Sequence, residues 1–133
     1  MKKYGTYLGL VAIGLFLAAL ILFRGDLVDY LSRSRTMQLS DSAKRSLAEQ
    51  IAARYDYRQN QLPYSCTFLE FGSTGCSACR QMERVMETVR TQHAGRVQVV
   101  FVNVSRKENQ ELAEYFGIAT IPTQVLLDRS GAE

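Results

Sequence analysis

The sequence has little proline, cysteine and histidine, and each shortage excludes a class of protein. With 2 Pro among 133 residues and 47% hydrophobic residues, the chain is not collagen-like, mucin-like or disordered. Its 3 Cys are too few for a small domain held together by disulfides. A structural zinc site needs about four ligands, and beside one close cysteine pair the chain offers Cys66 and His93. The length fits a single domain.

Acidic residues are absent from the N-terminal part of the chain. The first is Asp26, and residues 4–23 carry no charge of either sign. Lys2 and Lys3 account for most of the net charge of +3, and the rest of the chain is close to neutral. Because nucleic-acid binding needs a dense basic stripe, this balance argues against a nucleic-acid partner.

The uncharged residues 4–23 predict one transmembrane helix, and we assign residues 1–23 to it. Twenty residues at about 1.5 Å each reach roughly 30 Å, the thickness of the hydrocarbon core of a bilayer. The apolar run is longer than the usual signal-peptide core of about 7–15 residues, and no small-residue cleavage pattern follows Phe23. We therefore expect an uncleaved signal anchor, with a cleaved signal peptide or a buried helix as the alternatives.

The charges beside this segment leave its orientation open. Lys2 and Lys3 favour a cytoplasmic N-terminus, whereas Arg24, Arg33 and Arg35 on the other flank weaken that bias. Because the chain starts like a signal sequence, we expect a single-pass protein of the cell membrane. Its domain is expected to face the periplasm or the cell exterior.

Beyond the predicted anchor, residues 24–40 predict a partly ordered juxtamembrane linker and residues 41–133 a folded domain. The expected helices are 41–57, capped by Ser40 or Ser42, a helix from Cys76 to Ala94-Gly95, and 108–116. The expected strands are 66–71, then 97–104, whose apolar character suits a strand covered on both faces, and 123–127. Strand, helix and strand in this order predict parallel pairing with a right-handed crossover.

The chain closes on a turn. Asp128 to Gly131 is typical of a hairpin turn, yet Ala132 and Glu133 alone follow it. A turn without its return strand predicts a domain that is incomplete at its C-terminus.

Two cysteines three residues apart, Cys76 and Cys79, open the second of these helices. Both sulfurs then lie on the first turn, close enough to form a disulfide. The positive end of the helix dipole and its free N–H groups favour a thiolate at Cys76, and Arg80 adds a further positive field. Cys76 is therefore the candidate nucleophile, and Cys79 is the candidate resolving thiol.

The sequence resembles the thioredoxin superfamily over residues 64–131. The resemblance rests on the strand from Phe68 to Phe71, the motif Cys76-Ser77-Ala78-Cys79 after it, and the segment from Gly117 to Thr123. It implies a thioredoxin-like α/β fold, a three-layer sandwich. In that fold a βαβ unit is followed by an antiparallel strand after a cis-proline loop, and the family's last strand and helix would be missing here.

The resemblance also implies roles for three further residues. The Ile121-Pro122 bond would be cis, its loop would face the cysteines, and backbone groups of Ile121 would bind a substrate peptide. Glu70, six residues before Cys76, stands where the family carries a buried acid that moves protons to and from the resolving cysteine. Burial between apolar neighbours would raise the pKa of Glu70, and a surface acid on an edge strand is the alternative.

Two positions depart from the family pattern. Gly75 stands where an aromatic residue is usual, and Ser77-Ala78 replaces Gly-Pro between the cysteines. Because the intervening dipeptide tunes the redox potential, we expect a reductant or isomerase rather than a strong oxidant.

These observations predict a membrane-tethered protein-disulfide oxidoreductase. Its partners would be protein thiols and disulfides, the membrane through residues 4–23, and a membrane protein that supplies electrons. No organic cofactor or metal is required. The alternatives are a redox-inactive or copper-handling binding module of the same fold, a purely structural disulfide, and a membrane-anchored interaction domain.

The remaining conspicuous residues have ordinary structural interpretations. Cys66 is expected to be a buried small hydrophobe in its strand, and Met82 and Met86 are expected in the core. His93 favours the negative end of its helix. The basic residues between Arg33 and Arg45 are expected to form a solvated face near the membrane.

Overall fold

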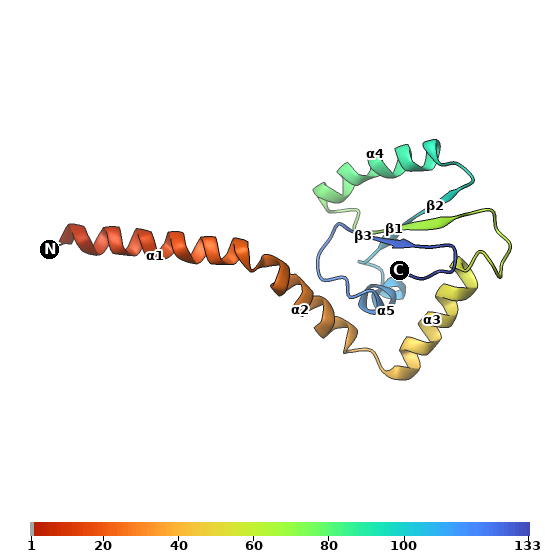
Figure 1. Ribbon diagram of the computed structural model, residues 1–133, viewed down its shortest axis with the longest axis horizontal. Coiled ribbons are helices and arrows are strands. Elements are labelled where there is room, and N and C mark those ends of the chain that lie inside the picture. The colour runs from red at the N-terminus through yellow and green to blue at the C-terminus, as the bar shows by residue number, and fades with distance from the viewer. Residues whose placement is uncertain (1) are drawn as a thin grey trace.

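The computed structural model describes residues 2–133, and it places an α/β domain at the end of a long helical arm (Figure 1). The helices are α1 (Lys2–Leu22), α2 (Arg24–Thr36), α3 (Asp41–Tyr55), α4 (Ser77–Gln92), the short 3-10 helix η1 (Lys107–Asn109) and α5 (Gln110–Tyr115). The strands are β1 (Cys66–Gly72), β2 (Val97–Asn103) and β3 (Thr123–Leu127). The predicted order of elements in the domain is therefore confirmed.

The three strands form a mixed sheet in the order β2-β1-β3. β1 runs parallel to β2 and antiparallel to β3, as predicted for a βαβ unit followed by an antiparallel strand. The register sets Glu70 of β1 between Phe101 of β2 and Gln124 of β3. Because β1 is the middle strand, its side chains are the most deeply buried of the sheet.

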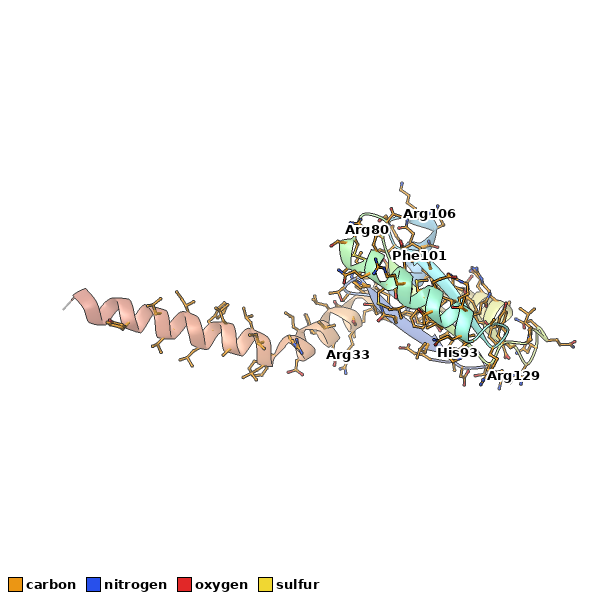
Figure 2. The ribbon with its side chains drawn as sticks, turned by 90° about the horizontal axis from the view of Figure 1, so that it is seen from above. Arg33, Arg80, His93, Phe101, Arg106 and Arg129 are labelled. Atoms are coloured by element: carbon orange, nitrogen blue, oxygen red, sulfur yellow. A yellow bond between two sulfur atoms is a disulfide. The ribbon has the colours of Figure 1, made fainter. Side chains whose placement is uncertain are left out.

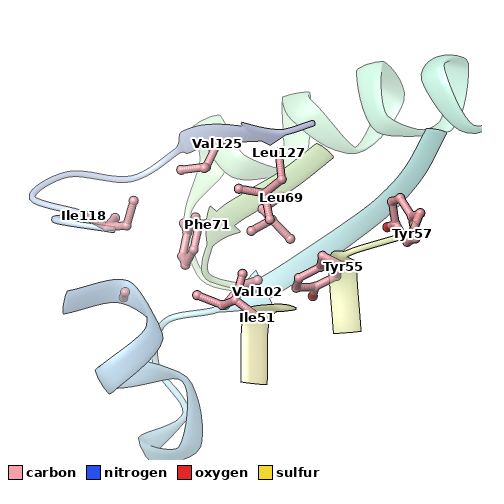
Figure 3. Packing of buried hydrophobic residues seen from close by; sticks show 10 residues of the cluster. Ile51, Tyr55, Tyr57, Leu69, Phe71, Val102, Ile118, Val125 and Leu127 are labelled. Carbon is pink, nitrogen blue, oxygen red and sulfur yellow. The ribbon is translucent and has the colours of Figure 1, made fainter. Parts of the chain in front are cut away.

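One face of the sheet carries the hydrophobic core (Figure 3). Leu47, Ile51 and Tyr55 recur every four residues along α3, so they form one apolar stripe that packs towards the sheet. The core cluster comprises Ile51, Tyr55, Tyr57, Leu69, Phe71, Val102, Ala113, Ile118, Val125 and Leu127. α3 begins where it was predicted to, because the Ser40 hydroxyl accepts a hydrogen bond of 3.2 Å from the backbone N–H of Ala43.

Helix α4 covers the opposite face of the sheet (Figure 1). Met86 is buried and Met82 is half-buried, which confirms that both belong to the packed side of α4. With α3 and α5 on one side and α4 on the other, the domain has the three layers that were expected.

Strand β2 differs from its prediction as a strand covered on both faces. It lies at an edge of the sheet that the described residues form, most of its side chains are only half-buried, and Phe101 is exposed by 40%. Helices lie on both sides of it, but an edge strand has a neighbour on one side only. The apolar sequence of β2 therefore correctly indicated helices on both faces, but the burial of its side chains was overestimated.

The first helix of the N-terminal arm, α1, is apolar and exposed. Along α1, the large apolar side chains from Leu10 to Leu22 point into solvent, with exposures of 48% or more. Among the side chains that the structure describes, which in α1 run without a gap from Gly9, no single helix meets the length and hydropathy of a membrane span. Gly9–Leu22 and Arg24–Thr36 meet them only as a pair, bent by 54°. The transmembrane helix that we predicted over 4–23 is present as the helix α1, but a single membrane span is not found among these described side chains.

Residues 24–36 were predicted as a partly ordered linker but form α2. Asp26 lies in the first turn and Arg33 and Arg35 lie in the last, which favours the helix through its dipole. The helix also docks against α5. Gly117, which closes α5 with φ +60°, lies so near α2 that an added Cβ would be 3.1 Å from the Ser32 carbonyl oxygen and the Thr36 hydroxyl. Tertiary packing therefore orders a segment whose sequence is mostly polar.

The turn after β3 packs against the end of α3. The backbone N–H of Tyr57 donates to the carbonyl oxygen of Arg129 at 3.0 Å, and the N–H of Asp128 donates to that of Ala132 at 2.7 Å. Gly131 has φ +79° at the point where the turn passes the backbone of Tyr55 and Asp56. The predicted hairpin turn is present.

Candidate active site

Cys76 and Cys79 lie at the start of α4 and are joined by a disulfide, with their Cα atoms 5.2 Å apart. Cys76 is the N-cap of the helix, and its sulfur accepts a hydrogen bond of 3.2 Å from the backbone N–H of Cys79. After reduction the same N–H and the positive end of the α4 dipole would stabilise a thiolate on Cys76. Arg80 lies at this end of α4, whereas His93 lies at the other (Figure 2).

The two sulfurs differ in access. Cys76 is partly exposed, whereas the side chain of Cys79 is 2% exposed. A substrate disulfide can therefore approach Cys76, and Cys79 can attack only from within the protein. This asymmetry agrees with the predicted assignment of nucleophile and resolving thiol.

Gly72, the last residue of β1, lets α4 approach the sheet at the cysteines. A Cβ at this position would lie 2.9 Å from Cε2 of Phe101 and 3.2 Å from the sulfur of Cys79. The sulfur of Cys79 thus lies directly over the end of β1. Only a residue without a side chain leaves that space free.

Glu70 precedes Gly72 by two residues, so its side chain lies on the same face of β1. It is 0% exposed, which excludes the interpretation as a surface acid. Oε2 accepts a hydrogen bond of 2.7 Å from Nε2 of Gln124, and Oε1 has no partner among the described residues. Burial raises the pKa of the Glu70 carboxyl, and the bond from Gln124 offsets part of that rise.

The Ile121-Pro122 bond is cis, as expected. Thr123, the next residue, pairs with Phe71, so the loop before β3 reaches the end of β1 where Gly72 meets Cys79. Figure 1 shows this loop and the start of α4 on the same side of the domain. The structure therefore brings the cysteine pair, Glu70 and the cis-proline loop together at one end of the sheet.

A groove of about 520 Å³ adjoins the cis-proline loop. Its lining residues are Arg35, Val104, Gln110, Ala113, Glu114, Ile118, Ala119, Thr120 and Ile121. Arg35 comes from α2, so the N-terminal arm contributes to the surface beside the candidate active site. Opposite charges from Arg35 and Glu114 give the groove a mixed polarity.

The other candidate residues lie apart from this site or beside it. Cys66 is a free thiol at the start of β1 and is only partly buried, which corrects the expectation of a fully buried residue. His93 caps the C-terminal end of α4, as its predicted position required. No group of three or more His, Cys, Asp or Glu side chains within residues 2–133 could hold a metal ion.

Sequence reasoning missed two residues of the site, Gly72 and Gln124. Gly72 lies just beyond the predicted strand 66–71, and its contact with Cys79 depends on how closely α4 packs against β1. Gln124 could have been found from the antiparallel pairing of β1 with β3, which sets it opposite Glu70. That deduction requires the strand order and the register of the sheet to be known.

Comparison with known proteins identifies the family. The family model for thioredoxin matches residues 48–133. The chain belongs to the thioredoxin family. A thioredoxin of Synechocystis sp. is 29% identical over 93 residues, covering 70% of this chain and 74% of the relative.

Two further relatives show how far the likeness extends. A thioredoxin of Alicyclobacillus acidocaldarius is 40% identical over 58 residues, 44% of this chain and 53% of the relative, so the chain matches about half of that protein's length. A chloroplastic thioredoxin-like protein of Arabidopsis thaliana is 27% identical over 88 residues, 66% of this chain and 34% of the relative. Among solved structures, a mutant thioredoxin from Halobacterium salinarum has 28% identity and a TM-score of 0.45, covering 53% of this chain and 58% of that one. Family membership supports a thiol–disulfide oxidoreductase kind of function.

Proposed function

We propose that this protein is a membrane-tethered thiol–disulfide oxidoreductase that reduces or isomerises disulfides of protein substrates. The observation that carries the proposal is the unequal cysteine pair at the start of α4, with Cys76 accessible and Cys79 buried beside Gly72. A redox pair needs one thiol that meets the substrate and one that resolves the intermediate. The cis-proline loop and the groove that adjoins it offer a place for the substrate backbone.

The reaction proceeds in two exchanges. The Cys76 thiolate attacks one sulfur of a substrate disulfide, and the other substrate sulfur leaves as a thiolate. Cys79 then gives its proton to the Glu70 carboxylate and attacks the Cys76 sulfur, which releases the second substrate sulfur. The substrate gains two electrons, the Cys76–Cys79 disulfide forms, and Glu70 passes its proton on to solvent or the leaving thiolate.

The N-terminal arm supports the membrane part of the proposal. An exposed apolar surface as long as that of α1 is unfavourable in water and favourable in a bilayer. The start of α4 and the loop before β3 lie on the side of the domain from which α1 extends (Figure 1), and Arg80 lies on that side as well (Figure 2). This placement supports a membrane protein as the electron donor that reduces the disulfide again, and a domain held outside the cytosol would need such a donor.

A trapping experiment tests the proposal with the full chain, expressed in bacterial membranes and purified in detergent micelles. We expect wild-type protein to reduce a model protein disulfide, Cys76→Ser to be inactive, and Cys79→Ser to accumulate a mixed disulfide with substrate. Cys66→Ser is the control and should keep wild-type rates, because Cys66 lies at the far end of β1. The chain should also stay with the membrane pellet after an alkaline wash and leave it in detergent.

Two results would overturn this proposal. Absence of both disulfide reduction and a trapped intermediate would refute the oxidoreductase, and release of the chain by the alkaline wash would refute the membrane tether.

A further inference from the structure

Glu70 has a hydrogen-bonding neighbour on one side only. Its register partners are Phe101 of β2, which has no polar atom in its side chain, and Gln124 of β3. The bond from Nε2 of Gln124 to Oε2 is 2.7 Å long, and Oε1 is left without a partner among the described residues. A buried carboxyl with one oxygen held and the other free is unusual enough to need an explanation.

The free oxygen lies on the face of β1 that carries Cys79. Glu70 and Gly72 share this face, and the sulfur of Cys79 is 3.2 Å from where a Cβ on Gly72 would stand. Rotation of the Glu70 carboxyl would exchange its two oxygens. The bond to Gln124 opposes that rotation and keeps one oxygen turned away from β3.

The other groups around Glu70 on this face are uncharged, or are charged side chains exposed to solvent. β1 itself adds the free thiol of Cys66, β2 adds Val97, Val99 and Phe101, and β3 adds Leu126. From α4 the facing residues are Cys79, Met82 and Met86, whereas its charged residues are all exposed: Arg80, Glu83, Arg84, Glu87 and Arg90. Cys79 is therefore the titratable group best placed to exchange a proton with Glu70.

We propose that Gln124 is a positioning residue that holds Oε2 of Glu70 and so leaves Oε1 to accept the proton of Cys79. This inference rests on the proposed redox function and assigns a part of it to a residue that acts through Glu70. The side chain of Gln124 is itself exposed. The orientation of the fully buried Glu70 carboxyl is thus fixed by a hydrogen-bond donor on the exposed side of β3.

The test compares Gln124→Met with Leu126→Met in the full chain in detergent micelles. Gln124→Met keeps the length of the side chain and removes the donor, whereas Leu126→Met changes an exposed residue on the same face of β3. The first readout is the carboxyl titration of Glu70 by carbon NMR in the oxidised protein, which needs no activity. The second is the pH profile of the resolving step, measured as release of a preformed mixed disulfide at Cys76.

We expect Gln124→Met to move the Glu70 titration to higher pH and to shift the pH profile of the resolving step in the same direction. Release should be several-fold slower near neutral pH and should recover in alkali, where Glu70 is ionised in both proteins. Leu126→Met should leave both curves in place. Attack of Cys76 on substrate, measured in the Cys79→Ser background, should be unchanged by Gln124→Met.

Unchanged curves in Gln124→Met, or equal shifts in both variants, would overturn the inference. Failure of the proposed function would look different, because wild-type protein would then reduce no disulfide while the NMR titration of Glu70 still reported on Gln124.

Discussion

At the scale of single residues, Asp56 shows how the domain keeps a buried charge. It is 2% exposed and accepts hydrogen bonds from the backbone, Nε and Nη2 of Arg58 and from Nε2 of Gln59, at 2.9 to 3.1 Å. The hydrogen bonds from the Arg58 side chain are the main reason that the pKa of Asp56 falls to about 2. Asp56 follows α3 directly, and its charge is held by partners within the loop after α3, while its backbone lies against the turn after β3.

This lowered pKa predicts an acid-sensitive contribution to stability. The unfolded chain takes up the proton near pH 3.8 and the folded one near 2, so the contribution is complete above pH 3.8 and is lost as the pH falls towards 2. Asp56→Asn should therefore be less stable than wild type at pH 5, and the difference should shrink by pH 2. Urea unfolding at a series of pH values measures it. Arg58→Met, which removes the side-chain donors and the positive charge, should show a loss of the same sign, and a difference that stays constant with pH would contradict the prediction.

At the scale of elements, the close approach of α4 to β1 decides where the resolving thiol lies. The sequence predicted both elements, and the cysteine pair at the start of the helix, because apolar spacing is a local signal. The space at Gly72 depends on the distance between two layers, and the bond from Gln124 depends on strand register. Neither quantity is encoded in a local pattern, so both residues were found only in the folded chain.

The substitution Gly72→Ala tests how closely α4 packs against β1. The new methyl group would meet Phe101 and Cys79, and overpacking of this kind costs about 1–3 kcal/mol. We expect a free energy of unfolding lower by that amount and slower closure of the Cys76–Cys79 disulfide. Gly75→Ala is the matched control, because nothing lies within 4 Å of a Cβ there. Chemical denaturation and quenched thiol trapping measure the two effects, and equal behaviour of the two variants would refute this account.

Two predictions about whole elements, for residues 24–36 and for β2, were wrong for a related reason. Residues 24–36 carry no apolar stripe to indicate a helix, and α2 is ordered by its dock on α5. β2 carries an apolar run like that of a central strand, yet it lies at an edge of the described sheet. The helical state of α2 and the burial of β2 thus depend on the elements packed beside them more than on their own residues.

At the scale of the whole molecule, the dock of α2 on α5 joins the N-terminal arm to the domain. Gly117 closes α5 in a left-handed conformation, and Ser32 and Thr36 of α2 pack directly against it. Arg35, which lies between these two residues in α2, lines the groove beside the cis-proline loop. The position of the arm and the shape of the candidate substrate groove are therefore linked.

Gly117→Asn should release this dock. Asparagine tolerates a left-handed backbone better than most residues, so the main cost is the collision of its side chain with α2. We expect faster hydrogen exchange along α2 and a lower free energy of unfolding. Gly95→Asn is the matched control, since Gly95 has φ +73° and nothing within 4 Å of a Cβ. If both variants leave exchange along α2 at the wild-type rate, the dock does not hold the helix.

A docked α2 also sets how far the redox site can travel. If residues 24–40 were a flexible chain, the distance between its ends would fluctuate around a root-mean-square value of roughly 20–25 Å. The 13 residues of α2 instead form a rigid helix of fixed length, about 20 Å. If the protein is tethered as proposed, a rigid α2 holds Cys76 at a fixed distance from the bilayer. Disulfides at that distance then meet Cys76 more often. Disulfides nearer to or farther from the membrane plane would then meet the site rarely, whatever their intrinsic reactivity.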